Sequence, residues 1–319
     1  MNFLVTGGAG FIGSHLTEAL LERGDRVIAL DNLSTGGHSN IERLLGRSDF
    51  EFVLGSILNV DLVDDLVSRS DAVFHLAAAV GVQLIVEHPL ESLATNIRGS
   101  EIIFEKAHKY GTKILVTSSS EIYGKNTSDR LKEDDDRILG SPLKSRWSYS
   151  EAKAIDEIFA YTYWREKGLE SVIVRLFNTV GPRQTGHYGM VVPRFASQAI
   201  RGEPLTVFGT GEQTRCFCYV GDVVQVLIDL IEHPEAYGRV FNVGGQEEIS
   251  ISQLATRVID IADSPSKISY TAYEEAYEEG FEDMQRRVPD ITRVRNLVGF
   301  EPRKSLDEII SLVLDEQRS

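Results

Sequence analysis

Short apolar runs alternate with amphipathic stretches along the first half of the chain. The runs predict buried strands at Asn2–Thr6, Arg26–Leu30, Phe50–Leu54, Ala72–Leu76, Lys113–Thr117 and Ser171–Arg175. Between them, apolar residues recur at helical spacing, which predicts helices at Phe11–Arg23, Val60–Ser68, Glu91–Tyr110 and Ser148–Lys167. Strands that alternate with helices of this length form parallel sheets covered on both faces. We therefore expect an α/β fold with a doubly wound parallel sheet.

The second half of the chain loses this regular alternation. Its pattern predicts shorter elements: helices at Pro193–Arg201, Val223–Ile231 and Ser252–Ala262, and strands at Leu205–Phe208, Arg215–Tyr219 and Val240–Val243. Smaller and less regular elements favour a second, smaller α/β lobe that packs against the sheet, with crossings back into it. We place the boundary between residues 1–176 and residues 177–319.

The composition is that of an ordinary soluble globular protein, with 319 residues, 42% of them hydrophobic, and a net charge of -15. So negative a chain argues against a broad nucleic-acid or anionic-membrane surface, because both need a cationic face. A small anionic ligand stays possible, since one site can be locally positive. The N-terminus does not have the pattern of a signal peptide, and no apolar run is long enough to span a bilayer. We expect a cytoplasmic protein.

The cysteines and the acidic runs carry no predicted chemistry. Cys216 and Cys218 are too few to supply the ligands of a structural zinc, and we interpret them as small buried residues of a reducing compartment. The acidic runs at 132–136 and 274–283 are interpreted as solvated faces. No metal site is predicted.

Three glycines lie between the first predicted strand and the first predicted helix. Gly7, Gly10 and Gly13 form a turn of the kind that lets a pyrophosphate approach the backbone and lie on the helix N-terminus. Asp31 ends the next strand, 18 residues after Gly13, where a carboxylate accepts hydrogen bonds from an adenosine ribose and repels a 2′-phosphate. No arginine follows at positions 32–35. The pattern predicts a site for NAD rather than NADP.

Two further segments follow predicted strands, at the sheet edge where open α/β folds bind their ligands. At His75–Ala78, small residues let a flat ring or a ribose lie against the backbone. At Thr117–Glu121, a run of hydroxyls can reach a substrate alcohol. Both segments are predicted to border the dinucleotide site.

Tyr149 and Lys153 open the predicted helix at Ser148–Lys167. They lie four residues apart and therefore share one helix face. A tyrosine with its ordinary pKa is a poor base at neutral pH, but a neighbouring ammonium favours the phenolate. The pair is a candidate general base with its tuning residue, and Lys153 can also bind ribose hydroxyls.

Taken together, GGAGFIGSHL, DNLSTG, HLAA, the serine cluster, YSEAK and LFNTVGPR resemble the extended short-chain dehydrogenase/reductases. The similarity is narrower to their nucleotide-sugar epimerase, dehydratase and decarboxylase family, and it runs from Asn2 to about Arg303. It implies a Rossmann domain that holds NAD tightly, and a C-terminal lobe that holds a UDP-sugar. It also implies a homodimer through the helices at Glu91–Tyr110 and Ser148–Lys167.

The resemblance also implies roles for individual residues. Tyr149 takes a proton from a sugar hydroxyl, Lys153 tunes it, and Ser119 binds the same sugar oxygen with help from Ser118 or Ser120. The positions implied for NAD are Gly7, Gly10, Phe11, Ile12, Gly13, Asp31, Asn32, Ser34, Thr35, Gly36, Leu76, Ala77, Ala78, Asn96, Ser118, Tyr149 and Lys153.

The substrate positions implied by the resemblance lie mostly in the second half of the chain. Asn178 contacts the sugar diphosphate, and residues 203–208 line the nucleotide base. Arg215 and Arg287 bind the diphosphate or an acid group of the sugar, because the planar guanidinium binds such anions bidentately. The full set implied for the substrate is Ser120, Asn178, Val192, Leu205, Val207, Phe208, Arg215 and Arg287.

The family shares oxidation at the sugar C4 and differs in the second step. Glu121 favours a decarboxylase that converts UDP-glucuronate to UDP-xylose, because those enzymes resemble this chain in their TSE-V-Y-G segment and in the Arg287-x-Pro-Asp spacing. Ser120 disfavours a dehydratase, which usually has an Asp-Glu pair at this place. The segment at 79–83 is closer to that of UDP-sugar 4-epimerases.

Three readings therefore stay open. Decarboxylation of UDP-glucuronate is preferred. The alternative is a 4-epimerase acting on UDP-glucose and UDP-galactose, or on UDP-glucuronate and UDP-galacturonate. An NAD-binding redox sensor without turnover is the third, and the presence of both Tyr149 and Lys153 argues against it. Glu121 is included among the candidate catalytic residues.

Overall fold

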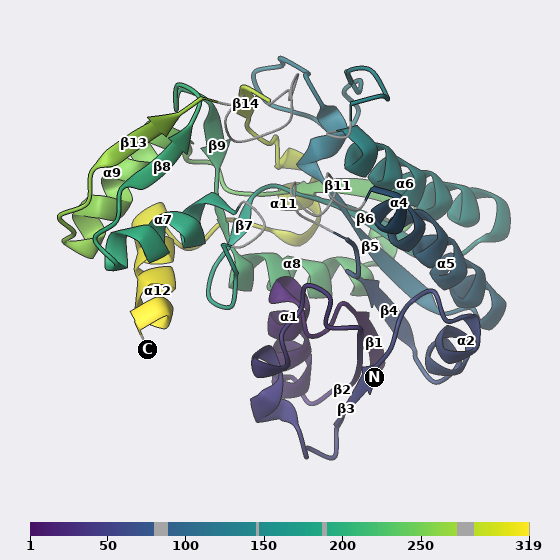
Figure 1. Ribbon diagram of the computed structural model, residues 1–319. Coiled ribbons are helices and arrows are strands. Elements are labelled where there is room, and N and C mark those ends of the chain that lie inside the picture. The colour runs from purple at the N-terminus through teal and green to yellow at the C-terminus, as the bar shows by residue number, and fades with distance from the viewer. Residues whose placement is uncertain (80–88, 145–146, 187–189, 273–283, 319) are drawn as a thin grey trace.

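The computed structural model describes residues 1–79, 89–144, 147–186, 190–272 and 284–318. Seven parallel strands form its central sheet, in the order β11-β6-β5-β4-β1-β2-β3 (Figure 1). Six of them confirm the strands predicted in the first half, to within one or two residues. The seventh comes from the second half and pairs with β6, so the predicted crossing back into the sheet is present. The seven strands are β1 (Asn2–Thr6), β2 (Arg26–Asp31), β3 (Phe50–Leu54), β4 (Ala72–His75), β5 (Lys113–Ser119), β6 (Ser171–Leu176) and β11 (Arg239–Val243).

The strand order reverses between β1 and β4. From β1 the chain builds outward through β2 and β3, and it then returns to place β4 on the other side of β1. The turns that leave β1 and β4 therefore diverge at the carboxyl edge of the sheet. A crevice at such a reversal is the usual ligand site of open α/β sheets.

Helices cover both faces of the sheet (Figure 1). Alternation in β1 shows the two layers: Phe3 and Val5 are buried in one core cluster and Leu4 in another. This alternation follows from the two-residue period of a strand. The first face carries α1 (Phe11–Glu22), α8 (Val220–Glu232) and α11 (Thr292–Val298), and the second carries α2 (Val60–Ser68), α5 (Gly99–Tyr110) and α6 (Ser148–Lys167).

The single helix predicted at Glu91–Tyr110 is interrupted. It consists of α4 (Pro89–Leu93), a π-helical turn η3 (Ala94–Arg98) and α5. Asn96 in the π turn is buried, and its side-chain amide bonds the backbone of Ala79 through both its oxygen and its nitrogen. The π turn therefore places Asn96 in contact with the loop after β4, and the local periodicity of the sequence does not reveal this contact.

The C-terminal lobe packs its own apolar core beside the sheet, at the left of Figure 1. The predicted strand at Arg215–Tyr219 is split at Phe217 into two strands. The lobe and its connections contain β7 (Thr179–Val180), α7 (Val191–Ile200), β8 (Leu205–Phe208), β9 (Thr214–Cys216), β10 (Cys218–Tyr219), β12 (Glu248–Ser250), α9 (Ile251–Ala262), β13 (Ile268–Thr271), β14 (Arg286–Arg287) and α12 (Leu306–Arg318). The boundary between residues 176 and 177 stays a prediction, since β11 and α8 return to the sheet. Short 3-10 turns are η1 (His38–Asn40), η2 (Glu42–Leu44), η4 (Ser120–Tyr123) and η6 (Pro234–Ala236).

Two minor expectations have different outcomes. Cys216 and Cys218 are buried and unbonded, as expected, and burial raises the pKa of the Cys216 thiol to about 12. The acidic run at 132–136 is not wholly solvated, because Glu133 is buried and accepts a hydrogen bond from the Asn242 amide at 2.9 Å. The run at 274–283 lies outside the described residues. Within the described ranges, no helix has the length and apolar character needed to cross a bilayer.

Candidate active site

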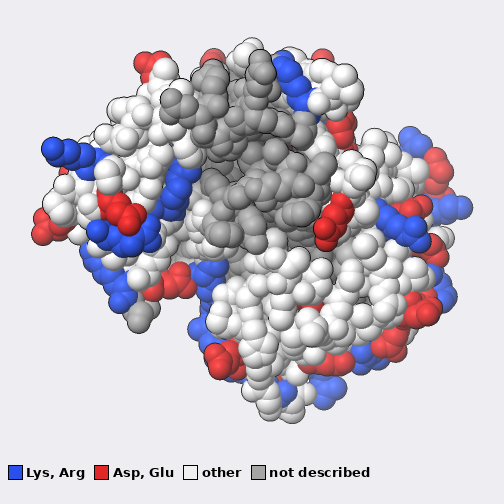
Figure 2. All heavy atoms as spheres, in the orientation of Figure 1, with Lys and Arg blue, Asp and Glu red and all other residues white. Residues whose placement is uncertain are grey.

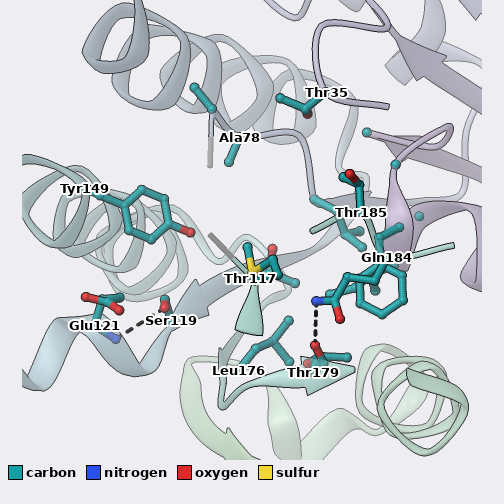
Figure 3. A pocket seen from close by; sticks show the side chains of 18 of the residues that line it. Thr35, Ala78, Thr117, Ser119, Glu121, Tyr149, Leu176, Thr179, Gln184 and Thr185 are labelled. Carbon is teal, nitrogen blue, oxygen red and sulfur yellow. Dashed lines mark hydrogen bonds between the residues drawn. The ribbon is translucent and has the colours of Figure 1, made fainter. Parts of the chain in front are cut away.

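A cavity of about 550 Å³ lies between the carboxyl edge of the sheet and the C-terminal lobe. This volume is within the range of small-molecule sites. The turns after β1, β2, β4 and β5 line one side, and α7, β9 and β14 line the other. Figure 3 shows the Tyr149 hydroxyl pointing into the cavity, with Ser119 and Glu121 below it and Gln184 on the far side. The residues predicted for NAD and those predicted for the sugar thus line one pocket.

The glycine turn leaves no room for side chains. Gly7 has φ of +73°, and a Cβ there would lie 2.9 Å from the Ala77 nitrogen. A Cβ on Gly13 would lie 2.0 Å from the Gly7 carbonyl oxygen. Gly10 caps α1, and among the described residues no side chain caps that helix end. The first amides of α1 are therefore presented to the cavity, where helix N-termini bind phosphates.

Asp31 is held in place at the end of β2 by the neighbouring backbone. Its two carboxylate oxygens accept hydrogen bonds from the Leu33 amide at 2.8 Å and the Ala9 amide at 3.0 Å. Burial raises the pKa of Asp31, and these backbone bonds oppose the shift. Asp31 also lines the cavity, where its carboxylate can accept hydrogen bonds from ribose hydroxyls. Together with the glycine turn, this geometry fits the adenosine and pyrophosphate of NAD.

The loop after β4 is held by a chain of uncharged hydrogen bonds. The Ala77 amide donates to Thr6 Oγ1, which contacts His75 Nδ1 at 2.8 Å. On the other side of the ring, Nε2 contacts Ser100 Oγ at 3.0 Å, and the Ser100 hydroxyl donates to the Asn96 carbonyl. Because that carbonyl can only accept, His75 Nε2 is the protonated nitrogen and Nδ1 accepts from Thr6. Burial and the Lys153 charge lower the pKa of His75 to about 3, so the ring is neutral.

Tyr149 and Lys153 both face the cavity from α6. Burial raises the pKa of Tyr149, Lys153 lowers it, and Glu121 and Asp156 raise it further. Lys153 thus acts in the predicted direction, but in the protein alone burial outweighs it. Lys153 is buried, and its Nζ donates to Asp156 Oδ2 at 2.9 Å, which leaves two N–H groups for the cavity.

Ser119 lies beside Tyr149 at the end of β5. Its Oγ accepts a hydrogen bond from the Glu121 amide at 3.2 Å, so its own proton stays available for donation. The neighbouring Ser118 Oγ is buried in the cavity wall and has no hydrogen-bond partner among the described residues. A buried hydroxyl of this kind is suited to a polar group of a bound ligand.

Glu121 and Arg287 form an ion pair in the cavity wall. Arg287 Nη1 lies 2.6 Å from Glu121 Oε1 and 3.4 Å from Ser120 Oγ. Arg287 also stands opposite Arg215, because β14 and β9 are paired in parallel register. Two like charges on neighbouring strands repel each other, and an anion between or beside them removes that cost. The arrangement suits a ligand with negatively charged groups.

Most of the predicted site residues line this cavity. For the catalytic set these are Tyr149, Lys153, Ser119 and Glu121; for the cofactor set Gly7, Gly10, Phe11, Ile12, Gly13, Asp31, Asn32, Ser34, Thr35, Leu76, Ala77, Ala78 and Ser118; and for the substrate set Ser120, Asn178, Val192, Phe208, Arg215 and Arg287.

Four predicted residues lie outside the lining. Leu205 and Val207 are fully buried in the lobe core, because strand alternation turns only Thr206 and Phe208 of β8 away from it. Asn96 lies behind the Ala79 backbone that it bonds. Gly36 lies behind Asp31, where an added Cβ would come within 3.1 Å of the carboxylate. These residues support the pocket wall. The epimerase-like segment at 79–83 lies outside the described residues after Ala79.

The structure adds residues that the sequence patterns did not indicate. Arg194 of α7 lines the cavity, donates to the Thr206 carbonyl and stacks 4.4 Å from the centre of the Phe208 ring. Its helical spacing, on the polar side of an amphipathic helix, predicts only an exposed residue. The others of note come from three connections after β3, β4 and β7: Ser56, Ile57, Glu91, Ser92, Thr95, Gln184 and Thr185.

The charge of the cavity differs from that of the chain. Its described lining contains four cations, Lys153, Arg194, Arg215 and Arg287, against three anions, Asp31, Glu91 and Glu121. Figure 2 shows Lys and Arg side chains on the C-terminal lobe with Asp and Glu side chains among them, as over the rest of that face. The described lining thus holds one more cation than anion, on a chain of net charge -15. No cluster of three metal-binding side chains occurs among the residues that the structure describes.

Comparison with known proteins gives consistent matches. Residues 3–244 match the NAD dependent epimerase/dehydratase family. The chain is 40% identical, over 96% of its length and 94% of the relative's, to a UDP-N-acetyl-alpha-D-glucosaminuronate decarboxylase of Bacillus cytotoxicus. It is 36% identical to UDP-glucuronic acid decarboxylase 1 of Xenopus tropicalis, over 96% of this chain and 69% of that protein.

The fold also matches a solved enzyme. The crystal structure of UDP-glucose 4-epimerase from Thermotoga maritima with UDP-glucose superimposes with a TM-score of 0.90 and 33% identity, over 100% of this chain and 99% of that one. These matches confirm the predicted Rossmann-type fold and the predicted cofactor NAD. The chain belongs to the NAD dependent epimerase/dehydratase family, and NAD is its cofactor.

Proposed function

We propose that the protein is an NAD-dependent decarboxylase of a UDP-uronate, and that it converts UDP-glucuronate to UDP-xylose through a 4-keto intermediate. The observation that carries this proposal is the Glu121–Arg287 ion pair, which lies in the same cavity as Tyr149 and Ser119. The C4 oxidation and reduction have their groups in Tyr149, Lys153 and Ser119, whereas Arg287 beside them offers a cation to a sugar acid group. The names of the two decarboxylase relatives support the same assignment.

In the first step, Tyr149 takes the proton of the C4 hydroxyl, and Ser119 donates a hydrogen bond to the same oxygen. Bound NAD supplies the hydride acceptor and later the hydride donor. Lys153 holds a positive charge beside the phenol and opposes the effect of burial on its pKa. The glycine turn and Asp31 would hold the adenosine half of NAD, and Lys153 and Ser118 would hold the other half.

In the second step, the C4 ketone makes the C5 acid a β-keto acid. Carbon dioxide leaves, its bonding electrons remain as an enolate, and the protonated Tyr149 and Ser119 donate to the enolate oxygen at C4. A proton then returns to C5, and Tyr149 gives its proton back to the C4 oxygen as the ketone is reduced. We assign Glu121, held by Arg287 at 2.6 Å, to proton transfer in these later steps. Arg287 keeps further N–H groups with which it can orient the acid group.

The nucleotide and diphosphate are assigned to the lobe. Arg215 and Arg287 stand on paired strands and suit the diphosphate and the uronate, and the Arg194–Phe208 stack offers a flat surface to the base. Asn178, with φ of 28°, is fixed by its bond to the Cys216 carbonyl and reaches the same cavity. Val192 completes the wall from α7.

The alternative is a UDP-sugar 4-epimerase. It is favoured by the similarity to the Thermotoga maritima epimerase, which covers the whole chain. The two reactions share Tyr149, Lys153 and Ser119, and they differ in what Glu121 and Arg287 do. A redox sensor without turnover has less support, because the Tyr149–Lys153 pair faces the cavity intact.

We also infer that the active protein is a cytoplasmic homodimer. On α6, Ile158 is 61% exposed and Tyr161 is 44% exposed, and the two lie one turn apart. Large apolar side chains side by side on a long helix are typical of an interface. The neighbouring helix α5 packs against α6, so a second copy can add two further helices to this pair.

The function is tested by product analysis. The NAD-loaded protein is incubated separately with UDP-glucuronate, UDP-N-acetylglucosaminuronate and UDP-glucose, and products are identified by mass spectrometry and NMR. The proposal predicts a UDP-pentose from UDP-glucuronate and no change in UDP-glucose. An inverted C4 with unchanged mass would establish the epimerase instead. Decarboxylation of the N-acetyl uronate alone would keep the reaction and change the substrate.

A further inference from the structure

The ammonium of Lys153 is paired with a carboxylate on the side away from the cavity. Nζ of Lys153 lies 2.9 Å from Oδ2 of Asp156, and their side chains are 3% and 0% exposed. Asp156 is one helical turn further along α6 and does not belong to the described lining of the cavity, whereas Lys153 does. The carboxylate is thus behind the lysine, out of reach of either ligand.

A carboxylate buried this completely is costly unless it is paired. In return, it supports the positive charge of a lysine whose burial disfavours that charge, and the Glu157 carboxylate supports the same charge. It also fixes the position of Nζ, because one N–H is committed to Asp156 and two are left for the cavity. Neither effect depends on which sugar is bound.

We propose that Asp156 is a positioning residue for catalysis: it anchors the Lys153 ammonium at the cavity wall and balances the charge beside the Tyr149 hydroxyl. The inference rests on the proposed role of Tyr149 as the base and is independent of decarboxylation.

The charges around Tyr149 determine the direction in which Asp156 shifts the pKa of the phenol. Lys153 and Asp156 reach it from α6 and Glu121 from η4, while His75 of β4, which faces Lys153, is neutral. Asp156 opposes the effect of Lys153, since a nearby anion disfavours the phenolate. Asp156 therefore holds Lys153 in place, but its negative charge cancels part of the effect by which Lys153 lowers the pKa of Tyr149. Replacing Asp156 by Asn keeps an oxygen that accepts from Nζ and removes the negative charge.

The test measures the phenol directly. NAD-loaded Asp156→Asn and wild type are titrated by ultraviolet difference absorbance, each against its own Tyr149→Phe counterpart, so that the other tyrosines cancel. The proposal predicts that the Tyr149 titration moves to lower pH in Asp156→Asn. Glu166→Gln removes one carboxylate from the exposed end of the same helix and is the control, which should titrate as wild type.

A second variant separates anchoring from charge. Asp156→Ala removes the hydrogen-bond acceptor as well, and the proposal predicts NAD binding weakened several-fold in equilibrium titration, whereas Asp156→Asn binds NAD as wild type does. Folding of each variant is checked by circular dichroism. An unchanged Tyr149 titration in folded Asp156→Asn, or NAD affinity unchanged in folded Asp156→Ala, would overturn the proposal. None of these measurements requires turnover, so they stand apart from the test of the proposed reaction.

Discussion

Tyr149 is subject to opposing influences in the described site. Burial raises its pKa, Lys153 lowers it, and the two carboxylates Glu121 and Asp156 raise it. Since the base must lose its proton before it can act, a raised pKa means that the oxidation step speeds up as pH rises from neutral. The Y-x-x-x-K spacing predicted the pair and the direction of the Lys153 effect. It could not predict the burial of the phenol or the approach of Glu121, because these depend on other elements, and it did not consider Asp156, which lies further along the same helix.

The first prediction concerns Tyr149→Phe. The variant keeps the ring and loses only the group that accepts the proton, so turnover should fall on the order of 10²–10⁴-fold. NAD should stay bound, since the glycine turn and Asp31 are untouched. Turnover is measured by product formation and bound NAD by release on denaturation. Turnover close to that of wild type would refute the assignment of Tyr149 as the base.

Glu121→Gln separates the two halves of the reaction. Oxidation does not use Glu121, so the first turnover should still reduce NAD, while the later steps slow and NADH accumulates on the enzyme. Absorbance at the NADH band during a single turnover measures this. Glu151→Gln is the matched control, because Glu151 is an exposed carboxylate on the nearby α6 that pairs with Arg137. If NADH never accumulates and the rate is unchanged, Glu121 has a structural role only.

At the scale of elements, periodicity predicted the strands of the sheet closely, because buried parallel strands are short apolar runs. Periodicity did not predict the features that depend on contacts with other parts of the chain. Asn96 lies in the π turn at Ala94–Arg98 and bonds the backbone of Ala79. In β8, Phe208 faces the cavity whereas Val207 is buried in the lobe core. The Glu121–Arg287 pair joins positions 166 residues apart, so only the assembled fold brings it together.

The loop after β4 leads to a prediction about acid stability. His75 has a pKa of about 3 in the folded protein and an ordinary value of about 6.5 when unfolded. Its neutral form therefore contributes stability that is present above pH 6.5 and is lost as pH falls toward 3. Integrated to pH 5, the loss is about 2 kcal/mol. His75→Gln removes the titrating group and keeps a hydrogen-bond donor and acceptor.

Urea unfolding of both proteins at pH 7.5 and pH 5 measures this effect. The difference in unfolding free energy between wild type and His75→Gln should shrink by about 2 kcal/mol on going to pH 5. A difference that stays constant between the two pH values would show that His75 can take up a proton in the folded state.

At the scale of the whole molecule, the net charge of the chain is negative, whereas four cations line the described cavity. The composition predicted an acidic exterior and the motifs predicted a positive cleft, and the described cavity lining holds four cations beside three anions. Arg194, however, was not foreseen, because nothing in the pattern of α7 marks it as a ligand-binding residue. The cavity needs both halves of the chain, since the glycine turn and Tyr149 come from one and Arg215 and Arg287 from the other.

The proposed dimer makes the remaining prediction at this scale. Ile158→Glu places a charge in the centre of the apolar surface on α6, which should shift the protein from dimer to monomer. Light scattering coupled to size-exclusion chromatography measures the mass. Glu166→Lys, an equally exposed change near the end of the same helix, is the control. A wild-type protein that is already monomeric would contradict the proposed interface.

In the proposed reaction, the sugar acid group leaves as carbon dioxide. The most direct measurement follows UDP-glucuronate labelled with carbon-13 at the carboxyl carbon by NMR in the presence of the NAD-loaded protein. We expect the label to appear in carbon dioxide and bicarbonate while an unlabelled UDP-pentose accumulates in equal amount. Label retained in a UDP-uronate with an inverted C4 would contradict it.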